Sequence, residues 1–223
     1  MRIAIVGAGN IGGNLARLFA AAGHQVTISF TRDPAALERL AGQLGVTAAT
    51  PEQAVRDAEV VVLSVPWGVV DEALAAAGGP AGLAGRTVLD ATNQFTRRDG
   101  ALEVIDLGEL SAAAYNARKV PAARWVKVFN TLTSGFQASA AGRTGPDRVV
   151  MFYATGDDGA GETAARLVNA AGFDPVRTGT LARDEVGHQE PKGDLYGEEF
   201  HRDEALALVV KLRGTPPSGR GRP

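Results

Sequence analysis

The 223-residue sequence has no cysteine, which excludes disulfides, thiolate metal sites and cysteine nucleophiles. It also lacks long apolar runs: the longest, Val60 to Pro66, is interrupted by Ser64 and is far too short to cross a bilayer. The formal net charge of −2 gives none of the positive excess typical of proteins that bind nucleic acids or anionic membranes. We therefore expect a cytoplasmic protein with a small-molecule substrate, no nucleic-acid partner and no membrane partner, and we leave a homodimer open.

Sequence motifs of several enzyme classes are missing as well. There is no HExxH motif and no compact cluster of His, Asp and Glu, so we expect no metal, and no GxSxG motif of a serine hydrolase. We interpret His24, His188 and His201 as structural or solvent-facing residues. Lys127 lies within a predicted strand and Lys192 in a loop, and the chain is too short for the long helical domain of β-hydroxyacid dehydrogenases.

Strands and helices alternate through the first 130 residues. Strands are predicted at 2–6, 25–30, 59–65, 86–91 and 125–129, and helices at 11–22, 34–45 and 108–119. This alternation predicts an α/β fold with a doubly wound, largely parallel sheet of the Rossmann type. Beyond residue 135 the pattern loosens into two strand candidates, 148–155 and 174–178, and two helix candidates, 161–171 and 200–212.

The expected organisation has three parts. A Rossmann domain covers residues 1–134, and a small C-terminal αβ lobe at 135–213 completes the substrate crevice. The proline- and glycine-rich residues 214–223 are expected to form a disordered tail.

The strongest motif is Gly7-Ala8-Gly9-Asn10-Ile11-Gly12, which follows the first strand and opens the first helix. GxGxxG alone is a weak signal, but at the start of a βαβ unit it predicts a dinucleotide site. Gly7 would permit the tight turn, Gly9 the close approach of a pyrophosphate, and Gly12 the packing of the helix on the strand. Amides near Asn10 and Ile11 would donate to the phosphates, helped by the helix dipole.

The segment after the second strand decides which dinucleotide is preferred. Enzymes that bind the non-phosphorylated cofactor place a carboxylate there, on the ribose hydroxyl. Here Arg32 offers a planar guanidinium for a 2′-phosphate, and Ser29 and Thr31 add hydroxyl groups. Asp33 is an alternative ribose ligand, but its position before Pro34 favours a helix cap. We predict an NADP(H) site, with a merely solvated Arg32 as the rival interpretation.

Three further strands end in polar or aromatic residues that would converge on one crevice at the carboxyl edge of the sheet. The first of these ends is Val65-Pro66-Trp67, and the other two carry Asn93 and the pair Asn130-Thr131. Trp67 is equally explained as a core or rim aromatic, and the asparagines as turn residues.

Five segments carry a family resemblance: MRIAIVGAGNIGGNLARLFAAAGH, VVLSVPW, VLDATNQ, WVKVFNTL and ATGDD. They resemble the NADPH-dependent oxidoreductases of the deazaflavin coenzyme (factor four-twenty), and also the cytosolic reductase domain of membrane ferric reductases. The resemblance extends to about Tyr196, and VPW together with KVFNTL is its most specific part.

The resemblance implies a role for each matching residue. Gly7, Gly9, Asn10, Ile11 and Gly12 would form the pyrophosphate loop, and Thr31 and Arg32 the 2′-phosphate site. The cofactor ring would lie near Pro66, Trp67, Asn93, Asn130 and Thr131, which become the ring-orienting candidates, with Val65 among the cofactor-binding residues. Archaeal members carry a second basic residue beside Arg32 and a histidine in place of Asn130, a departure that concerns the second substrate more than NADP.

No acid or base stands out among these residues, so the catalytic residue stays unassigned. Hydride exchange between a nicotinamide and a deazaflavin requires two stacked rings and no compulsory proton donor from the protein. We therefore expect an NADP(H)-dependent oxidoreductase that transfers hydride between NADPH and a deazaflavin-type coenzyme. Two alternatives remain: a reductase of another acceptor (an imine, a flavin or a ferric complex), and a non-catalytic NADPH-sensing protein. The loop at 182–197, with Glu190, Pro191 and Tyr196, is predicted to line or cover the pocket mouth.

Overall fold

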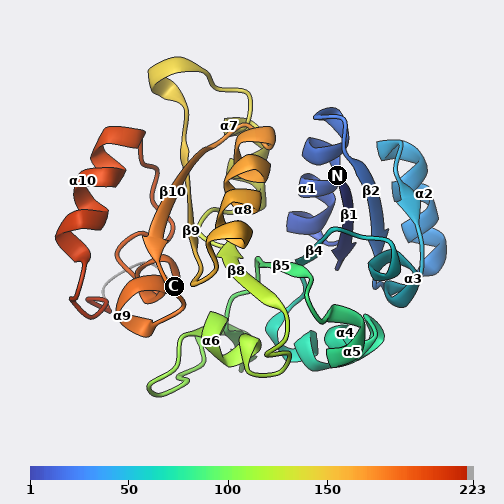
Figure 1. Cartoon of the computed structure of the whole chain (residues 1–223), viewed down its shortest axis with the longest axis horizontal. Coiled ribbons are helices and arrows are strands. Elements are labelled where there is room, and N and C mark those ends of the chain that lie inside the picture. The colour runs from blue at the N-terminus through green and yellow to red at the C-terminus, as the bar shows by residue number, and fades with distance from the viewer. Residues whose placement is uncertain (220–223) are drawn as a thin grey trace.

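A central twisted sheet with helices on both faces organises the chain (Figure 1), and the computed structural model describes residues 1–219. The strands are β1 (Arg2–Val6), β2 (Gln25–Ser29), β3 (Thr47–Ala48), β4 (Val60–Leu63), β5 (Thr87–Asp90), β6 (Phe95–Arg98), β7 (Ala101–Val104), β8 (Arg124–Val128), β9 (Val150–Ala154) and β10 (Asp174–Gly179). The α-helices are α1 (Asn10–Ala21), α2 (Pro34–Leu44), α3 (Pro51–Arg56), α4 (Val70–Ala76), α5 (Gly79–Leu83), α6 (Ala112–Ala117), α7 (Ser134–Ala140), α8 (Asp158–Ala170), α9 (Arg183–Val186) and α10 (Arg202–Leu212). Three 3₁₀ turns are η1 (Trp67–Val69), η2 (Gly145–Asp147) and η3 (Gly187–Gln189).

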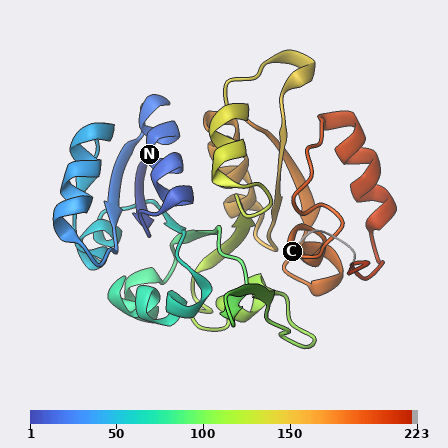
Figure 2. The same ribbon diagram turned by 180° about the vertical axis from the view of Figure 1, so that it is seen from behind.

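Within residues 1–219, eight strands form the main sheet in the order β10-β9-β8-β5-β4-β1-β2-β3. Neighbouring strands pair in parallel except β8 and β9, which are antiparallel. The strand order changes direction around β1 and β4, which is where doubly wound sheets bind their ligands. The predicted doubly wound, largely parallel fold is confirmed, and α2 and α10 lie at opposite ends of it (Figures 1 and 2).

Alternation along the strands divides the core between the two faces of the sheet. Ile3 and Ile5 of β1 point to one face and pack in a cluster with residues of α1, α2 and α8. Ala4 and Val6 point to the other face and pack with residues of α3, α4 and α5. Both faces of the parallel strands are therefore covered, as burial of such strands requires.

A hairpin formed by β6 and β7 was not predicted. Its turn residues Asp99 and Gly100 have φ of 51° and 84°, the positive values that a two-residue type I′ turn demands. The Asp-Gly pair is a strong hairpin signal in itself. It is masked here by the arginines of β6, which make the strand look like a polar loop.

The C-terminal residues extend the main sheet. β9 and β10 are its last two strands, and α10 packs over them through a cluster that includes Phe152, Phe200 and Val209. The division into a Rossmann domain and a separate lobe remains a prediction. Of the expected disordered tail, Thr215 accepts a hydrogen bond from His188 through its carbonyl oxygen. Residues 220–223 lie outside the described residues.

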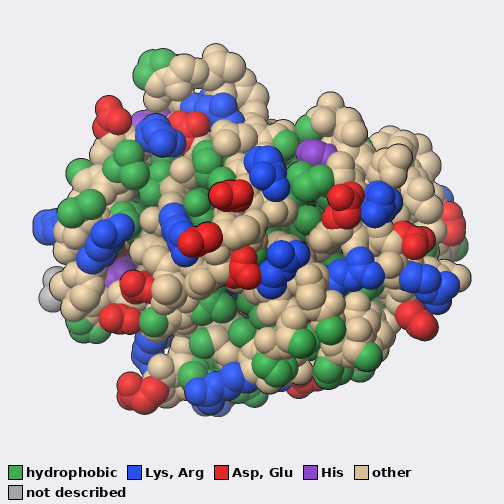
Figure 3. All heavy atoms as spheres, in the orientation of Figure 1, with side chains coloured by type: hydrophobic (Ala, Val, Ile, Leu, Met, Phe, Trp, Pro, Cys, Tyr) green, Lys and Arg blue, Asp and Glu red, His purple; other side chains and the backbone are tan. Residues whose placement is uncertain are grey.

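The surface carries charges of both signs. Figure 3 shows Lys and Arg interspersed with Asp and Glu over one face, in keeping with the net charge of −2. Among the described helices, none is long and apolar enough to span a membrane.

Candidate cofactor and acceptor site

The loop between β1 and α1 gives each of its three glycines a separate geometric role. Gly7 is left-handed with φ of 106°, and a Cβ there would lie 2.5 Å from the carbonyl oxygen of Ser64. A Cβ on Gly12 would lie 1.9 Å from the carbonyl oxygen of Gly7, so α1 packs directly on the loop backbone. A Cβ on Gly9, in contrast, would meet nothing within 4 Å. The space beside Gly9 is therefore left open for a ligand.

The N-terminus of α1 has no side-chain cap. Gly9 occupies the N-cap position, and the first turn contains no acidic residue. By comparison, α2 and α8 are capped by Asp33 and Asp157. Uncapped amides at a helix N-terminus are a ready anion site, so Gly9, Asn10 and Ile11 form a cradle that fits the pyrophosphate of a dinucleotide.

An exposed cation follows β2. Arg32 is exposed, and its guanidinium has no ion-pair or hydrogen-bond partner among residues 1–219. Asp33 is already engaged, because it accepts from the amide of Ala36 at 3.0 Å and pairs with Arg39 at 3.8 Å. The helix cap predicted for Asp33 is confirmed, and this favours a phosphate on Arg32 over a ribose on Asp33. Thr31 is exposed beside them.

Ser29 does not belong to this anion site, contrary to the sequence prediction. The side chain is fully buried, and its hydroxyl donates to the carbonyl oxygen of Ile5 at 3.0 Å. Its backbone carbonyl accepts from the amide of Gly7 at 3.0 Å. Ser29 thus holds β2 and the glycine loop against β1, and it has no surface left for a ligand.

A polar clasp joins the ends of β5 and β8 to the loop after η3. The Nδ2 of Asn93 donates to the carbonyl oxygen of Asn130 at 2.9 Å and to the phenol oxygen of Tyr196 at 3.3 Å. The Nδ2 of Asn130 donates to the Oδ1 of Asn93 at 3.2 Å and to the carbonyl oxygen of Gln189 at 2.6 Å. Asn93 and Asn130 are therefore brought together, and Tyr196 joins them; we call this the Asn93–Asn130–Tyr196 clasp.

The chain turns sharply where β8 ends. Phe129 is buried and left-handed with φ of 62°, a conformation that is strained for a bulky residue. The Nε2 of Gln137 holds the turn by donating to the carbonyl oxygens of Phe129 and Leu132, at 3.1 and 2.8 Å. This turn places Asn130 and Thr131 at the strand end, both almost fully buried.

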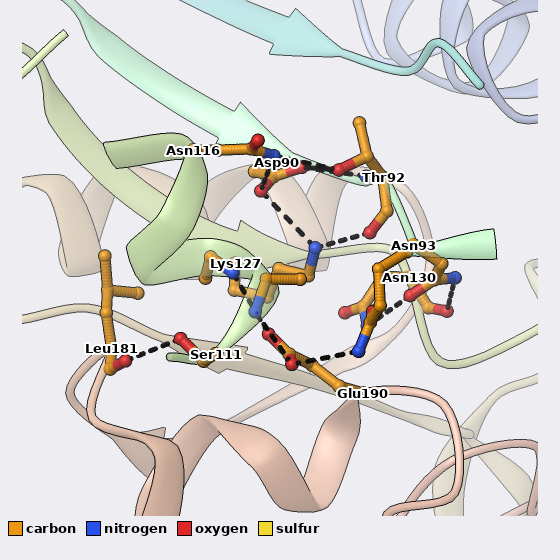
Figure 4. Close-up of polar contacts among 12 residues, drawn as sticks. Asp90, Thr92, Asn93, Ser111, Asn116, Lys127, Asn130, Leu181 and Glu190 are labelled. Carbon is orange, nitrogen blue, oxygen red and sulfur yellow. Dashed lines mark hydrogen bonds and ion pairs between the residues drawn. The ribbon is translucent and has the colours of Figure 1, made fainter. Parts of the chain in front are cut away.

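A fully buried ion pair adjoins the clasp (Figure 4). Lys127 of β8 lies 3.3 Å from Asp90 of β5, and both side chains are at most 1% exposed. Asp90 also accepts from the amide and hydroxyl of Thr92, at 2.8 and 2.7 Å, and from Asn116 at 3.1 Å. Lys127 donates to the carbonyl oxygen of Thr92. Because Thr92 precedes Asn93, this network fixes the turn that presents Asn93 to the clasp.

Glu190, in the loop predicted to line or cover a pocket mouth, is a buried anchor. Its carboxylate accepts from the amides of Ala112 and Ala113, at 3.0 and 3.1 Å, and from Gln94 at 3.5 Å. Burial raises the pKa of Glu190, although the nearby charge of Lys127 acts in the opposite direction. Glu190 therefore ties its loop to the start of α6 (Figure 4).

The segment after β4 contributes aromatic and apolar surface. Pro66 is exposed and Trp67 is half-buried, with its ring 5.6 Å from that of Tyr115. Val65 is buried, and its Cγ1 would lie 2.7 Å from a Cβ on Gly7, so it backs the glycine loop. The structure thus leaves Pro66 and Trp67 accessible to a ligand and Val65 beneath them.

A cavity of about 360 Å³ lies next to the clasp. Gln94, which follows Asn93, and the anchor Glu190 both line it, together with parts of the segments 104–110, 187–193 and 216–219. The Oε1 of Gln94 is buried without a hydrogen-bond partner among the described residues. The volume of the cavity gives space for a ligand of moderate size.

The histidines make structural contacts. His188 is buried and bonds to Asp194 at 2.7 Å, and His24 lies 3.3 Å from the N-terminal amine. His201 bonds to the carbonyl oxygen of Arg148 at 3.2 Å. In the part of the chain that the structure describes, no group of three or more His, Asp or Glu is placed to hold a metal.

Comparison with known proteins identifies the family. Residues 2–94 match the family described as NADP oxidoreductase, coenzyme F420-dependent. A hypothetical protein from Sinorhizobium meliloti is 30% identical, with a TM-score of 0.78 over 91% of this chain and 96% of that one. A protein from Arthrobacter sp. FB24, provisionally described as an F420-dependent NADP reductase, is 27% identical, with a TM-score of 0.72 over 81% and 86%.

More distant structures share the fold. A reductive aminase from Aspergillus terreus, solved with NADPH and ethyl-5-oxohexanoate, is 22% identical, with a TM-score of 0.62 over 95% of this chain and 61% of that one. None of the curated proteins matches the chain. With a Rossmann-like sheet, an open glycine cradle and these relatives, the chain belongs to the family of F420-dependent NADP oxidoreductases and is an NADP-dependent oxidoreductase.

Proposed function

We propose that this protein transfers hydride between NADPH and a small-molecule acceptor, and that a deazaflavin coenzyme is the acceptor. The observation that carries the proposal is the open space at Gly9, beside the uncapped N-terminus of α1. The unpaired Arg32 at the end of β2 adds a site for the 2′-phosphate. The family's description names the same cofactor and the same deazaflavin.

Each part of the site has a distinct task in this proposal. Gly9, Asn10 and Ile11 hold the pyrophosphate, while Arg32 and Thr31 hold the 2′-phosphate. NADPH, when bound, supplies the hydride. Trp67 and the Asn93–Asn130–Tyr196 clasp hold the nicotinamide and the acceptor in contact, while the buried Thr131 supports the clasp through its carbonyl oxygen, which accepts from the amide of Gly197. The protein therefore contributes mainly orientation.

A second candidate acceptor is a carbonyl or an imine. The phenol of Tyr196 in the clasp favours it, since such acceptors need a proton as well as a hydride. The reductive aminase that shares the fold was solved with NADPH and a keto ester, which fits this alternative.

A panel of acceptors tests the proposal. Oxidation of NADPH is followed by absorbance with a deazaflavin coenzyme, a free flavin, a cyclic imine, a ketone and a ferric chelate. We expect turnover with the deazaflavin. Turnover only with the imine or ketone would favour the second candidate, and tight NADPH binding without any turnover would indicate an NADPH-sensing protein.

A further inference from the structure

The phenol oxygen of Tyr196 accepts a hydrogen bond from Asn93 in the clasp, whereas its own O–H has no acceptor among residues 1–219. We infer that Tyr196 is a proton donor of this oxidoreductase, acting on an acceptor with a polar double bond, C=N or C=O. The inference rests on the proposed hydride transfer from NADPH and on its second candidate acceptor, and it deepens that candidate by assigning the proton donor.

The position of Tyr196 is fixed from two sides. Its phenol oxygen accepts from the Nδ2 of Asn93 at 3.3 Å, and its ring packs edge-on against Phe95 with centroids 6.4 Å apart. On the backbone, the amide of the next residue, Gly197, donates to the carbonyl oxygen of Thr131 at 2.9 Å. The phenol is thus held beside the carboxyl ends of β5 and β8, which lie at the same edge of the parallel sheet as the carboxyl end of β1 and the glycine loop.

The amide orientations in the clasp leave the phenol proton free. The Nδ2 of Asn93 faces the carbonyl oxygen of Asn130, which can only accept, so this group must be the amide nitrogen. Tyr196 therefore accepts from Asn93, and its own O–H has no acceptor among residues 1–219. A partly buried tyrosine hydroxyl without an acceptor in the protein is suited to donate its proton to a ligand atom.

The phenol is protonated at neutral pH. Burial raises the pKa of Tyr196 above its ordinary value of 10, with no contribution from a charged group. Charged residues on the neighbouring elements are engaged elsewhere: Glu190 accepts from the amides of α6, Asp194 bonds to His188, and Lys127 pairs with the carboxylate of β5. Tyr196 is therefore present as the acid form.

The carbon of C=N or C=O gains the hydride that NADPH supplies, its π bond breaks, and the heteroatom takes the proton from Tyr196. The Nδ2 of Asn93 stabilises the developing phenolate, which regains a proton from water. The sum is NADPH, a proton and the acceptor going to NADP⁺ and an amine or alcohol.

Tyr196→Phe tests the inference, with Tyr153→Phe as the matched control. Tyr153 lies on β9, outside the clasp, and burial raises its pKa too. Measurements are kcat with a cyclic imine and with a deazaflavin coenzyme, the NADPH Kd by calorimetry, and the ultraviolet titration of tyrosine in the free protein. General acid catalysis contributes about 10² to 10⁴-fold, so Tyr196→Phe should lower kcat with the imine by at least about a hundredfold.

The other readouts separate a proton donor from a structural residue. NADPH Kd and melting temperature should match those of Tyr153→Phe, and the titration should lose one phenol that ionises above the ordinary value. An unchanged kcat with the imine, a parallel rise in NADPH Kd, or a phenolate already present at neutral pH would each overturn the inference. Wild-type turnover of the deazaflavin but not of the imine overturns it while leaving the proposed function intact. No turnover with any acceptor overturns both.

Discussion

The glycine-loop region and the central edge of the sheet are built in opposite ways. The glycine loop is local in sequence: residues 7–12 set their own backbone shape, and the space they enclose is open. The central edge, at the ends of β5 and β8, is assembled from segments around residues 92, 116, 130 and 190 that meet through buried hydrogen bonds. A cofactor cradle can thus be specified by a short motif, whereas an acceptor site depends on the packing of the whole fold.

The largest expected effect is a loss of folding stability on breaking the buried ion pair between Lys127 and Asp90. Lys127→Met leaves Asp90 buried without its cation, and removing one partner of such a pair costs about 3–5 kcal/mol. Urea unfolding should show this loss, and Lys211→Met, at an exposed position on α10, serves as the control. A stability of Lys127→Met equal to that of the control would mean that the pair does not hold the central edge together.

Substitutions at two glycines sharpen the contrast within the loop. In Gly9→Val the added carbons enter the open cradle, so NADPH binding should be lost, by about a hundredfold or more, in a folded protein. Gly12→Val should destabilise the fold instead, because its Cβ would overlap the carbonyl oxygen of Gly7. Calorimetry with NADPH and circular dichroism separate the two outcomes. Undiminished NADPH affinity in Gly9→Val would remove the basis for the cofactor site.

Features that depend on residues close together in the chain could be predicted from the sequence, whereas features that depend on long-range packing could not. The loop, the Asp33 cap and the strand ends follow from local spacing, and the structure has them where the sequence placed them. The pairing of Lys127 with Asp90 could not be predicted, because only the register of β5 on β8 brings the two residues together. The same holds for Glu190, whose partners at the start of α6 lie nearly 80 residues earlier.

A moderate loss of NADPH affinity is expected when Arg32, the proposed ligand of the 2′-phosphate, is removed. A hydrogen bond to a charged group contributes about 1.5–3 kcal/mol, so Arg32→Ala should weaken NADPH binding roughly ten- to a hundredfold while leaving NADH binding nearly unchanged. Arg39→Ala is the matched control, since Arg39 is exposed nearby but pairs with Asp33. Equal losses for NADPH and NADH would show that Arg32 supports the fold rather than the phosphate.

The smallest expected effect is a pH dependence of the stability that Glu190 contributes at the central edge. Burial raises the pKa of Glu190 above its ordinary value of 4.5, so its contribution to stability is fully present below that value and declines as pH rises through the folded pKa. Glu190→Gln cannot titrate, and it costs about 1 kcal/mol at all pH values by losing an acceptor for the α6 amides. The stability of wild type minus that of Glu190→Gln should therefore fall as pH rises above 4.5. A difference that rises with pH would contradict the assignment.

The division of labour that we propose is that the glycine loop binds the cofactor while the central edge, with Trp67, orients the reaction. Its most direct test measures kcat and NADPH Kd on Trp67→Ala in one preparation, together with the melting temperature. Misplacing reacting rings by about 1 Å costs on the order of a hundredfold in rate, so kcat should fall steeply while NADPH Kd changes by less than about threefold. A lower melting temperature with kcat and Kd changing in parallel would instead make Trp67 a core residue and contradict the division of labour.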